Sequence, residues 1–162
     1  MRIFVALGTH KQQFNRLLKA VDEIAKNNSK IEFFAQIGNS DYLPKNYAFK
    51  KFLTSEEYEN EIKKADVVVS HAGAGSIISA LAQKKPIVLV PRLKKYGEHT
   101  DDHQVDIANA LQRKGKAIVV NDLKKLYIAL QEAKDFKPAL RSSKKKLILR
   151  IRKFLSECYE KK

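Results

Sequence analysis

A glycine-rich loop, residues 70–76, is the segment whose residue types most clearly suggest chemistry. Gly73 and Gly75 stand where an apolar run gives way to a helical pattern. Glycine lets the backbone adopt positive φ and approach a ligand closely. The helix that follows offers free N–H groups and the positive end of its dipole, which favour a phosphate. With the hydroxyl of Ser76 and the ring of His71 beside it, the loop predicts a phosphate site. The alternative is a tight turn whose glycines serve only packing.

The loop does not match the familiar nucleotide motifs. In the dinucleotide-binding fingerprint G-x-G-x-x-G, the third glycine would fall on Ile78 of this chain. That fingerprint also follows the first strand, whereas this loop follows the fourth predicted strand. No P-loop pattern occurs in the sequence either. The sequence therefore argues against NAD or ATP sites of these kinds.

A second polar segment, YGEHTDDHQ at residues 96–104, opens another predicted helix. Beside a phosphate site, such a segment can hydrogen-bond a sugar. His99 and His103 are four residues apart with acids nearby, which is also compatible with a metal site. However, TDD is typical of a helix N-cap with acids in the first turn, so we predict no metal. A plain solvated loop is the remaining alternative.

The chain that must position these segments alternates apolar strands with amphipathic helices. Such strands are usually buried on both faces, which favours a doubly wound, Rossmann-like α/β fold with a mostly parallel sheet, in one domain over residues 1–162. Ligands then bind at the carboxyl ends of the strands, near the point where the strand order reverses. The predicted strands are 2–8, 30–38, 47–53, 65–73, 86–91 and 116–120, and the predicted helices are 11–27, 54–64, 75–85, 101–115, 122–136 and a closing basic helix within 137–162.

The formal net charge of +14 suggests a polyanionic neighbour. Ten Lys or Arg and only two Glu fall within 137–162, where Leu140, Leu147, Ile151, Phe154 and Cys158 form an apolar stripe. This amphipathic helix is expected to pack on its own domain, or to dock on a partner or an anionic membrane surface. A nucleic-acid-binding module is the alternative from another class, but no nucleic-acid motif appears. One cysteine, and no apolar run near ~20 residues, favour a cytoplasmic protein without disulfides.

Two parts of the sequence resemble glycosyltransferase family 28. ADVVVSHAGAGSIISALAQKKPIVLVP, followed by DDHQVDIANAL, is similar to the C-terminal, donor-binding half of these GT-B enzymes. Relatives include MurG and the catalytic subunit of the dolichol-linked N-acetylglucosaminyltransferase. ALGTHKQQFNRLL with KKYGEHTDDHQ looks closer still to PssE-type catalytic subunits of bacterial capsule and exopolysaccharide transferases. The resemblance covers residues 1–134.

This resemblance implies an inverting hexosyltransferase that uses a UDP-sugar as donor substrate and needs no cofactor. Its residues for the UDP diphosphate would be Gly8, Thr9, His71, Gly73, Ala74, Gly75 and Ser76. Uracil would lie against the backbone at Phe52 and Leu53. The sugar hydroxyls would be bound by Asp102, His103 and Gln104, with Glu98 beside them. If this chain supplies the catalytic base, His10 and His99 are the candidates.

The sequence departs from the family at one position. A glutamate that binds ribose hydroxyls in the family corresponds here to Ser79, so ribose recognition would fall to another group such as Glu98. The chain is too short to hold an acceptor domain as well. We therefore expect a membrane-anchored, acceptor-binding partner subunit that holds this chain at the cytoplasmic face of the membrane near a lipid-linked sugar. A non-catalytic partner subunit is the further alternative.

Overall fold

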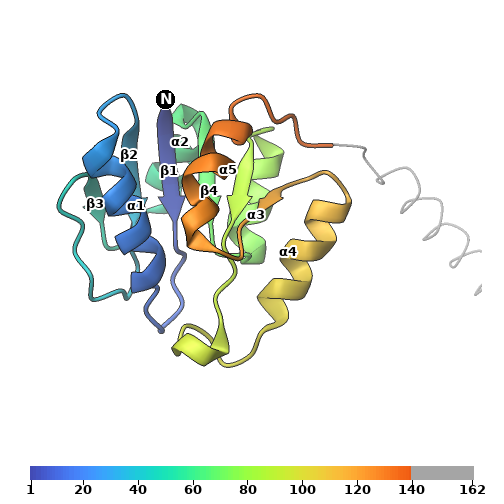
Figure 1. The fold of residues 1–162 in the computed structure, drawn as a ribbon, viewed down its shortest axis with the longest axis horizontal. Helices are drawn as coiled ribbons and strands as arrows, with labels where there is room; N and C mark the ends of the chain where they lie inside the picture. Colours follow the sequence, from blue (N-terminus) through green and yellow to red (C-terminus); the bar gives the residue numbers. More distant parts are fainter. Residues whose placement is uncertain (140–162) are drawn as a thin grey trace, which may run out of the picture.

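The computed structural model of the chain describes residues 1–139, so nearly all of the predicted basic helix lies outside the described part. Six parallel strands form one sheet in the order β3-β2-β1-β4-β5-β6 (Figure 1). This confirms the predicted doubly wound α/β class. The strands are β1 (Arg2–Ala6), β2 (Glu32–Gln36), β3 (Ala48–Lys50), β4 (Val67–Ser70), β5 (Ile87–Leu89) and β6 (Ile118–Val119).

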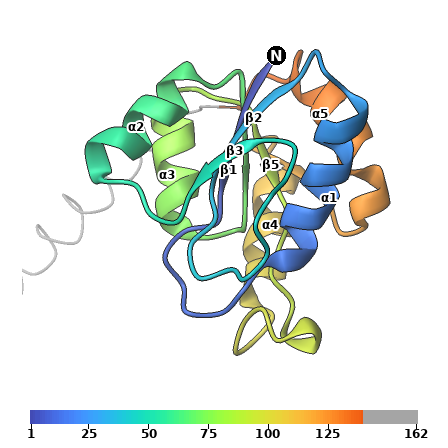
Figure 2. The same ribbon diagram turned by 90° about the vertical axis from the view of Figure 1, so that its left-hand side faces the viewer.

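Helices cover both faces of the sheet, as Figure 2 shows from the side. The helices α1 (Asn15–Asn27) and α5 (Leu126–Ala133) pack on one face, and α2 (Ser55–Lys64), α3 (Ala74–Ala82) and α4 (His103–Arg113) pack on the other. Alternate residues of β1 serve the two layers: Ile3 and Val5 join the first core, and Phe4 and Ala6 join the second. Both faces of the strand are therefore buried, which explains its unbroken apolar run.

The reversal of strand order lies between β1 and β4. The first three strands extend the sheet to one side, and the chain then returns to add β4 on the other side of β1, pairing Ile3 with Val67. The loops that follow β1 and β4 consequently lie next to each other at the carboxyl edge of the sheet. This explains why a ligand loop can come after the fourth strand: in this topology the fourth strand is central.

Some element boundaries differ from those predicted. The strand expected at 47–53 is only β3, because the chain leaves the sheet edge after Lys50 to begin α2. The helix expected from residue 11 begins at Asn15, and the helix expected at 122–136 is a 3-10 turn (η2, Leu123–Lys125) followed by α5. A capping box begins α2, as the T-x-x-E spacing of Thr54 and Glu57 in the sequence indicates. Thr54 Oγ1 accepts from the Glu57 N–H at 3.2 Å, and Glu57 Oε2 accepts from the Thr54 N–H at 2.9 Å. Within residues 1–139, no helix is both long and apolar enough to cross a membrane.

Candidate functional site

A cleft of about 360 Å³ opens at the carboxyl edge of the sheet, beside the reversal point. It joins the loop after β1, the end of β2, the loop between β3 and α2, and the first turns of α2 and α3. Five of the predicted UDP residues therefore come together in one hollow. The residues that line it are Gly8, Thr9, Gln36, Leu53, Thr54, Ser55, Tyr58, Glu59, Gly75, Ser76 and Ser79.

The N-terminus of α3 borders this cleft without a side-chain cap. The first hydrogen bond of the helix runs from the Ile77 N–H to the Gly73 carbonyl at 3.2 Å. Within the described part of the chain, the N–H groups of Ala74, Gly75 and Ser76 have no protein acceptor. Ser76 Oγ accepts from the Tyr58 hydroxyl at 2.9 Å, which leaves its own proton to donate. An uncapped helix start with a free hydroxyl is suited to bind a phosphate.

Neither glycine of this loop adopts the positive φ that we expected from the sequence. What matters at these positions is the space left by the absent side chain. Gly73 has φ −81°, and Gly75 is not among the residues with positive φ, whereas Gly8 has φ +69°. A Cβ at Gly73 would lie 2.3 Å from His71 Nε2, and one at Gly8 would lie 2.7 Å from His71 Cε1. At Gly75 a Cβ would meet no atom within 4 Å. Only Gly75 therefore leaves room for a ligand, while the other two make room for a ring.

That ring is the buried imidazole of His71, which lies against both glycine loops. His71 Nδ1 is 3.2 Å from the Ala6 carbonyl, which can only accept, so Nδ1 carries the proton of the neutral ring. Burial, followed by the charge of Arg92, lowers the pKa of His71 to about 4. His71 thus stays neutral at physiological pH and supports the loops after β1 and β4. A direct contact with UDP stays a prediction.

The other end of the cleft is organised by Gln36, a residue that the sequence analysis missed. Its Nε2 donates to the Gly8 carbonyl at 3.2 Å, and its Oε1 accepts from the Leu53 N–H at 3.2 Å. Leu53 lines the cleft, and its contact with uracil stays a prediction. Phe52 is 47% exposed and is not among the lining residues. The signal for Gln36 was a polar residue at the end of the apolar run EFFAQ.

The loop after β5 is fixed by the fully buried Arg92. Its guanidinium donates to four carbonyls at 2.8–3.2 Å, in the loops after β1 and β5 (Leu7, Gln12, Gln13 and Glu98). It also lies over the Phe14 ring, 4.9 Å from the centroid. Burial lowers the pKa of Arg92 to about 10, so the group keeps its charge at neutral pH. Arg92 therefore joins two loops that carry predicted site residues.

Two predicted sugar contacts belong to the same scaffold. Glu98 is fully buried, and its carboxylate accepts two hydrogen bonds from Arg16, both at 2.9 Å, and one from the Leu93 N–H at 3.0 Å. Glu98 consequently does not fit as a sugar or ribose contact, because its carboxylate is fully buried and already accepts three hydrogen bonds from the protein. Gln104 is also buried, and its Oε1 accepts from the Arg92 N–H at 3.1 Å.

Three histidines and one acid gather where the loop after β1 meets the segment between β5 and α4. The rings of His10 and His99 stack at 4.7 Å, and His99 and His103 meet edge to face at 4.8 Å. Asp101 hydrogen-bonds both the ring and the N–H of His103. The ligand atoms of His99, Asp101 and His103 lie within 4.8 Å of one another, so this group is able to hold a divalent metal ion. The sequence expectation of no metal stays a prediction.

The catalytic-base candidates, His10 and His99, each accept a backbone N–H at Nδ1. Burial, with the neighbouring His99 and Arg92, lowers the pKa of His10 below its usual range. Nδ1 of His10 accepts from the Gln12 N–H at 3.3 Å, which places the proton of the ring on Nε2. His99 accepts from the Asp101 N–H in the same way. In this arrangement both rings present a donor, so a role as base requires a change of tautomer.

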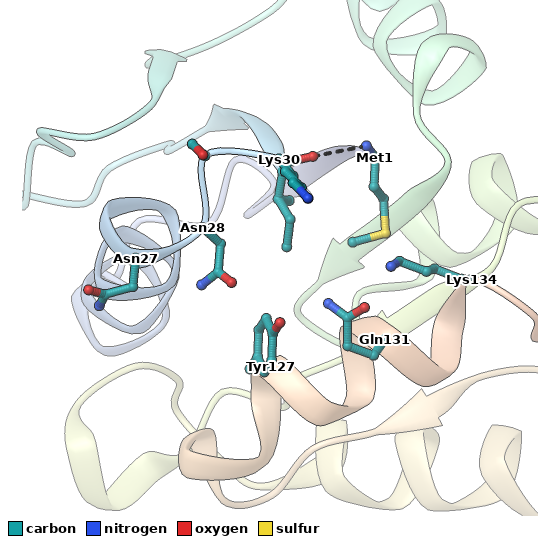
Figure 3. Close-up of a pocket in the computed structure, with 9 residues that line it drawn as sticks. Met1, Asn27, Asn28, Lys30, Tyr127, Gln131 and Lys134 are labelled. Carbon is teal, nitrogen blue, oxygen red and sulfur yellow. Dashed lines mark hydrogen bonds between the residues drawn. The ribbon is translucent and has the colours of Figure 1, made fainter.

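Several other hollows lie apart from the cleft. One of about 610 Å³ lies between the loop after β5 and the start of α4 and is bordered by Asp102 and His103. Another of about 470 Å³ lies near the amino end of β1, between the end of α1 and α5 (Figure 3), where the Met1 amino group donates to the Lys30 carbonyl at 3.2 Å. The second hollow contains none of the predicted site residues, so it does not compete with the cleft as the site.

The strand order and the position of the cleft define a Rossmann-like α/β domain, the class from which each half of a GT-B glycosyltransferase is built. The model of the glycosyltransferase family 28 C-terminal domain matches residues 2–157, and the chain belongs to this family. The resemblance stated from the sequence is thereby confirmed at the level of the family. The closer likeness to PssE-type subunits stays a prediction.

Individual relatives agree with this family. The human "UDP-N-acetylglucosamine transferase subunit ALG13" is 31% identical over 123 residues, which cover 70% of this chain and 10% of that protein. A Myxococcus xanthus protein, "UDP-N-acetylglucosamine--N-acetylmuramyl-(pentapeptide) pyrophosphoryl-undecaprenol N-acetylglucosamine transferase", is 29% identical over 142 residues, 81% of this chain and 36% of that protein. The solved glycotransferase of kitacinnamycin shares the fold, with a TM-score of 0.65 and 22% identity over 83% of this chain and 34% of that one. The chain thus spans only a minor part of each.

Proposed function

We propose that this chain is the donor-binding, catalytic subunit of an inverting glycosyltransferase that transfers a hexose from a UDP-sugar to a lipid-linked acceptor in polysaccharide or glycolipid biosynthesis. The observation that carries the proposal is the free N-terminus of α3 in the cleft at the strand-order reversal. The family supports it, as do the names of its relatives, which are transferases of N-acetylglucosamine from UDP.

The chemistry requires little covalent help from the protein. When the sugar–phosphate bond breaks, negative charge grows on the β-phosphate. N–H groups and hydroxyls already aimed at that position stabilise the charge without reorganising. In this chain those donors would be the N–H groups of Gly75 and Ser76 and the Ser76 hydroxyl. The net charge of +14 adds a long-range attraction for the anionic donor.

The acceptor site and membrane attachment are assigned to a partner subunit. The human relative is named a subunit, which supports a heteromeric arrangement. The partner would bring the lipid-linked acceptor to the cleft and hold this chain peripherally at the cytoplasmic face of the membrane. His10 and His99, which lie where the loops after β1 and β5 meet, are the candidates for a base on this chain.

Calorimetry with UDP and a set of UDP-sugars tests the proposal, with the substitution Gly75→Asp as the decisive variant. A side chain at Gly75 meets no protein atom, and an acid in the first turn of a helix is tolerated, so the variant should fold. Its carboxylate would lie beside the diphosphate and should weaken UDP binding by a factor of roughly 10–100.

Gly75→Asn is the matched control, since it has almost the same size without the charge. We expect Gly75→Asn to bind UDP more tightly than Gly75→Asp, because only the latter adds like-charge repulsion. Equal affinity of the folded Gly75→Asp variant and the unaltered protein would reject the site. Absence of binding at millimolar UDP and UDP-sugar, with and without a partner subunit, would reject the function.

A further inference from the structure

One acidic residue lines the cleft, and no predicted role accounts for it. Glu59 lies on α2, with its side chain exposed at the cleft wall opposite α3. The other lining residues are uncharged. A lone carboxylate beside a phosphate-binding helix start is unfavourable for an anionic ligand unless it meets hydrogen-bond donors of that ligand.

Two residues of the neighbouring helix hold the carboxylate of Glu59 in place. Its Oε1 accepts from the Ser79 hydroxyl at 2.7 Å, and its Oε2 accepts from Gln83 Nε2 at 2.5 Å. Gln83 Nε2 also donates to the Glu59 carbonyl at 3.3 Å. An ionised carboxylate has about four acceptor positions. Each oxygen therefore keeps capacity for one more donor, and the side chain is oriented before any ligand arrives.

The position of Ser79 fixes where along a nucleotide this carboxylate would act. Ser79 lies three residues after Ser76 on the cleft-facing side of α3, about one turn or 5 Å beyond the free N–H groups. A carboxylate repels the phosphates and accepts hydrogen bonds only. The group of a nucleoside diphosphate that lies next to the phosphates and offers two neighbouring donors is the ribose, through its 2′- and 3′-hydroxyls.

We propose that Glu59, oriented by Ser79 and Gln83, forms the ribose subsite of this cleft. This inference rests on the proposed function, because it needs a nucleoside diphosphate bound at α3. It also answers the question raised by Ser79. The Ser79 hydroxyl donates to a carboxylate of α2, so a carboxylate lies beside position 79 although the residue there is a serine.

Comparison of UDP with 2′-deoxy-UDP tests the subsite, because the two ligands differ by one hydroxyl. A hydrogen bond to a charged acceptor is worth about 1.5–3 kcal/mol, so the unaltered protein should prefer UDP by a factor of roughly 10 or more. In Glu59→Ala the ratio of the two affinities should fall close to one. Ser79 and Gln83 are partly exposed and able to turn to water, so the variant should fold.

Glu56→Gln is the matched control, since Glu56 is exposed in the first turn of α2 and does not line the cleft. It should keep the full preference for UDP. An unchanged preference in Glu59→Ala, or equal binding of both ligands by the unaltered protein, would overturn the subsite while leaving the nucleotide site intact. If the unaltered protein binds neither ligand, the subsite and the proposed function both fall.

Discussion

Polar groups have opposite roles on the two sides of the carboxyl edge of the sheet. On the α3 side, the N–H groups of Gly75 and Ser76 have no protein acceptor within the described residues, and the carboxylate of Glu59 is exposed. On the β5 side, Arg92 and Glu98 are fully buried and bonded to neighbouring loops. The first side keeps hydrogen-bonding capacity for a ligand, and the second uses its capacity to hold the loops in place. Equally polar segments thus serve binding in one case and architecture in the other.

The largest effect should come from the buried arginine. Arg92→Met keeps the length and the apolar packing of the side chain but removes the donors of four carbonyls. We expect the free energy of unfolding to fall by roughly 3–5 kcal/mol, because buried carbonyls without donors are costly. Urea denaturation measures this, and a loss below about 1 kcal/mol would contradict the scaffold role of the β5 side.

Acid should weaken the fold through His71. Its pKa of about 4 in the folded protein lies below its ordinary value of 6.5, so between these pH values the unfolded state binds the extra proton. Stability should therefore be intact above pH 6.5 and fall by about 3 kcal/mol as the pH drops from 6.5 to 4. The measurement is urea unfolding across this range, with His71→Gln as comparison. An equally steep decline in that variant would assign the loss to other groups.

A matched pair of glycine substitutions sharpens the contrast within the loop itself. Gly73→Ala would drive a methyl group against the His71 ring, at a distance of 2.3 Å. We expect a loss of about 1–3 kcal/mol, as for other overpacked sites. Gly75→Ala meets open space and improves helix propensity, so its stability should change by no more than about 1 kcal/mol. Thermal unfolding of both variants is sufficient, and equal losses would refute the different roles of the two glycines.

The sequence predicted the fold well because local patterns determine it. Apolar runs separated by amphipathic helices specify a doubly wound sheet, and the T-x-x-E pattern at Thr54 specifies the start of α2. The glycine loop was also recognisable, because glycine is the residue type that close contacts require. The sequence could not show which close contact applied, because the His71 ring reaches Gly8 only after β1 and β4 pair.

The roles of individual acids were the least predictable part. Glu98 lies in the loop before α4 and Glu59 lies within α2, and the local sequence does not predict that the first is buried and the second exposed. Glu98 is neutralised by Arg16, which lies 82 positions earlier in the chain, while Glu59 meets Ser79 across two helices. Such pairings depend on tertiary packing, so a sequence pattern assigns the residue type but not the partner.

A structure of the protein determined in complex with UDP tests the central claim most directly. We expect the diphosphate within hydrogen-bonding distance of the Gly75 and Ser76 N–H groups, with the ribose facing Glu59. Electron density for UDP elsewhere on the molecule, or a cleft filled by the protein's own side chains at saturating UDP, would contradict it.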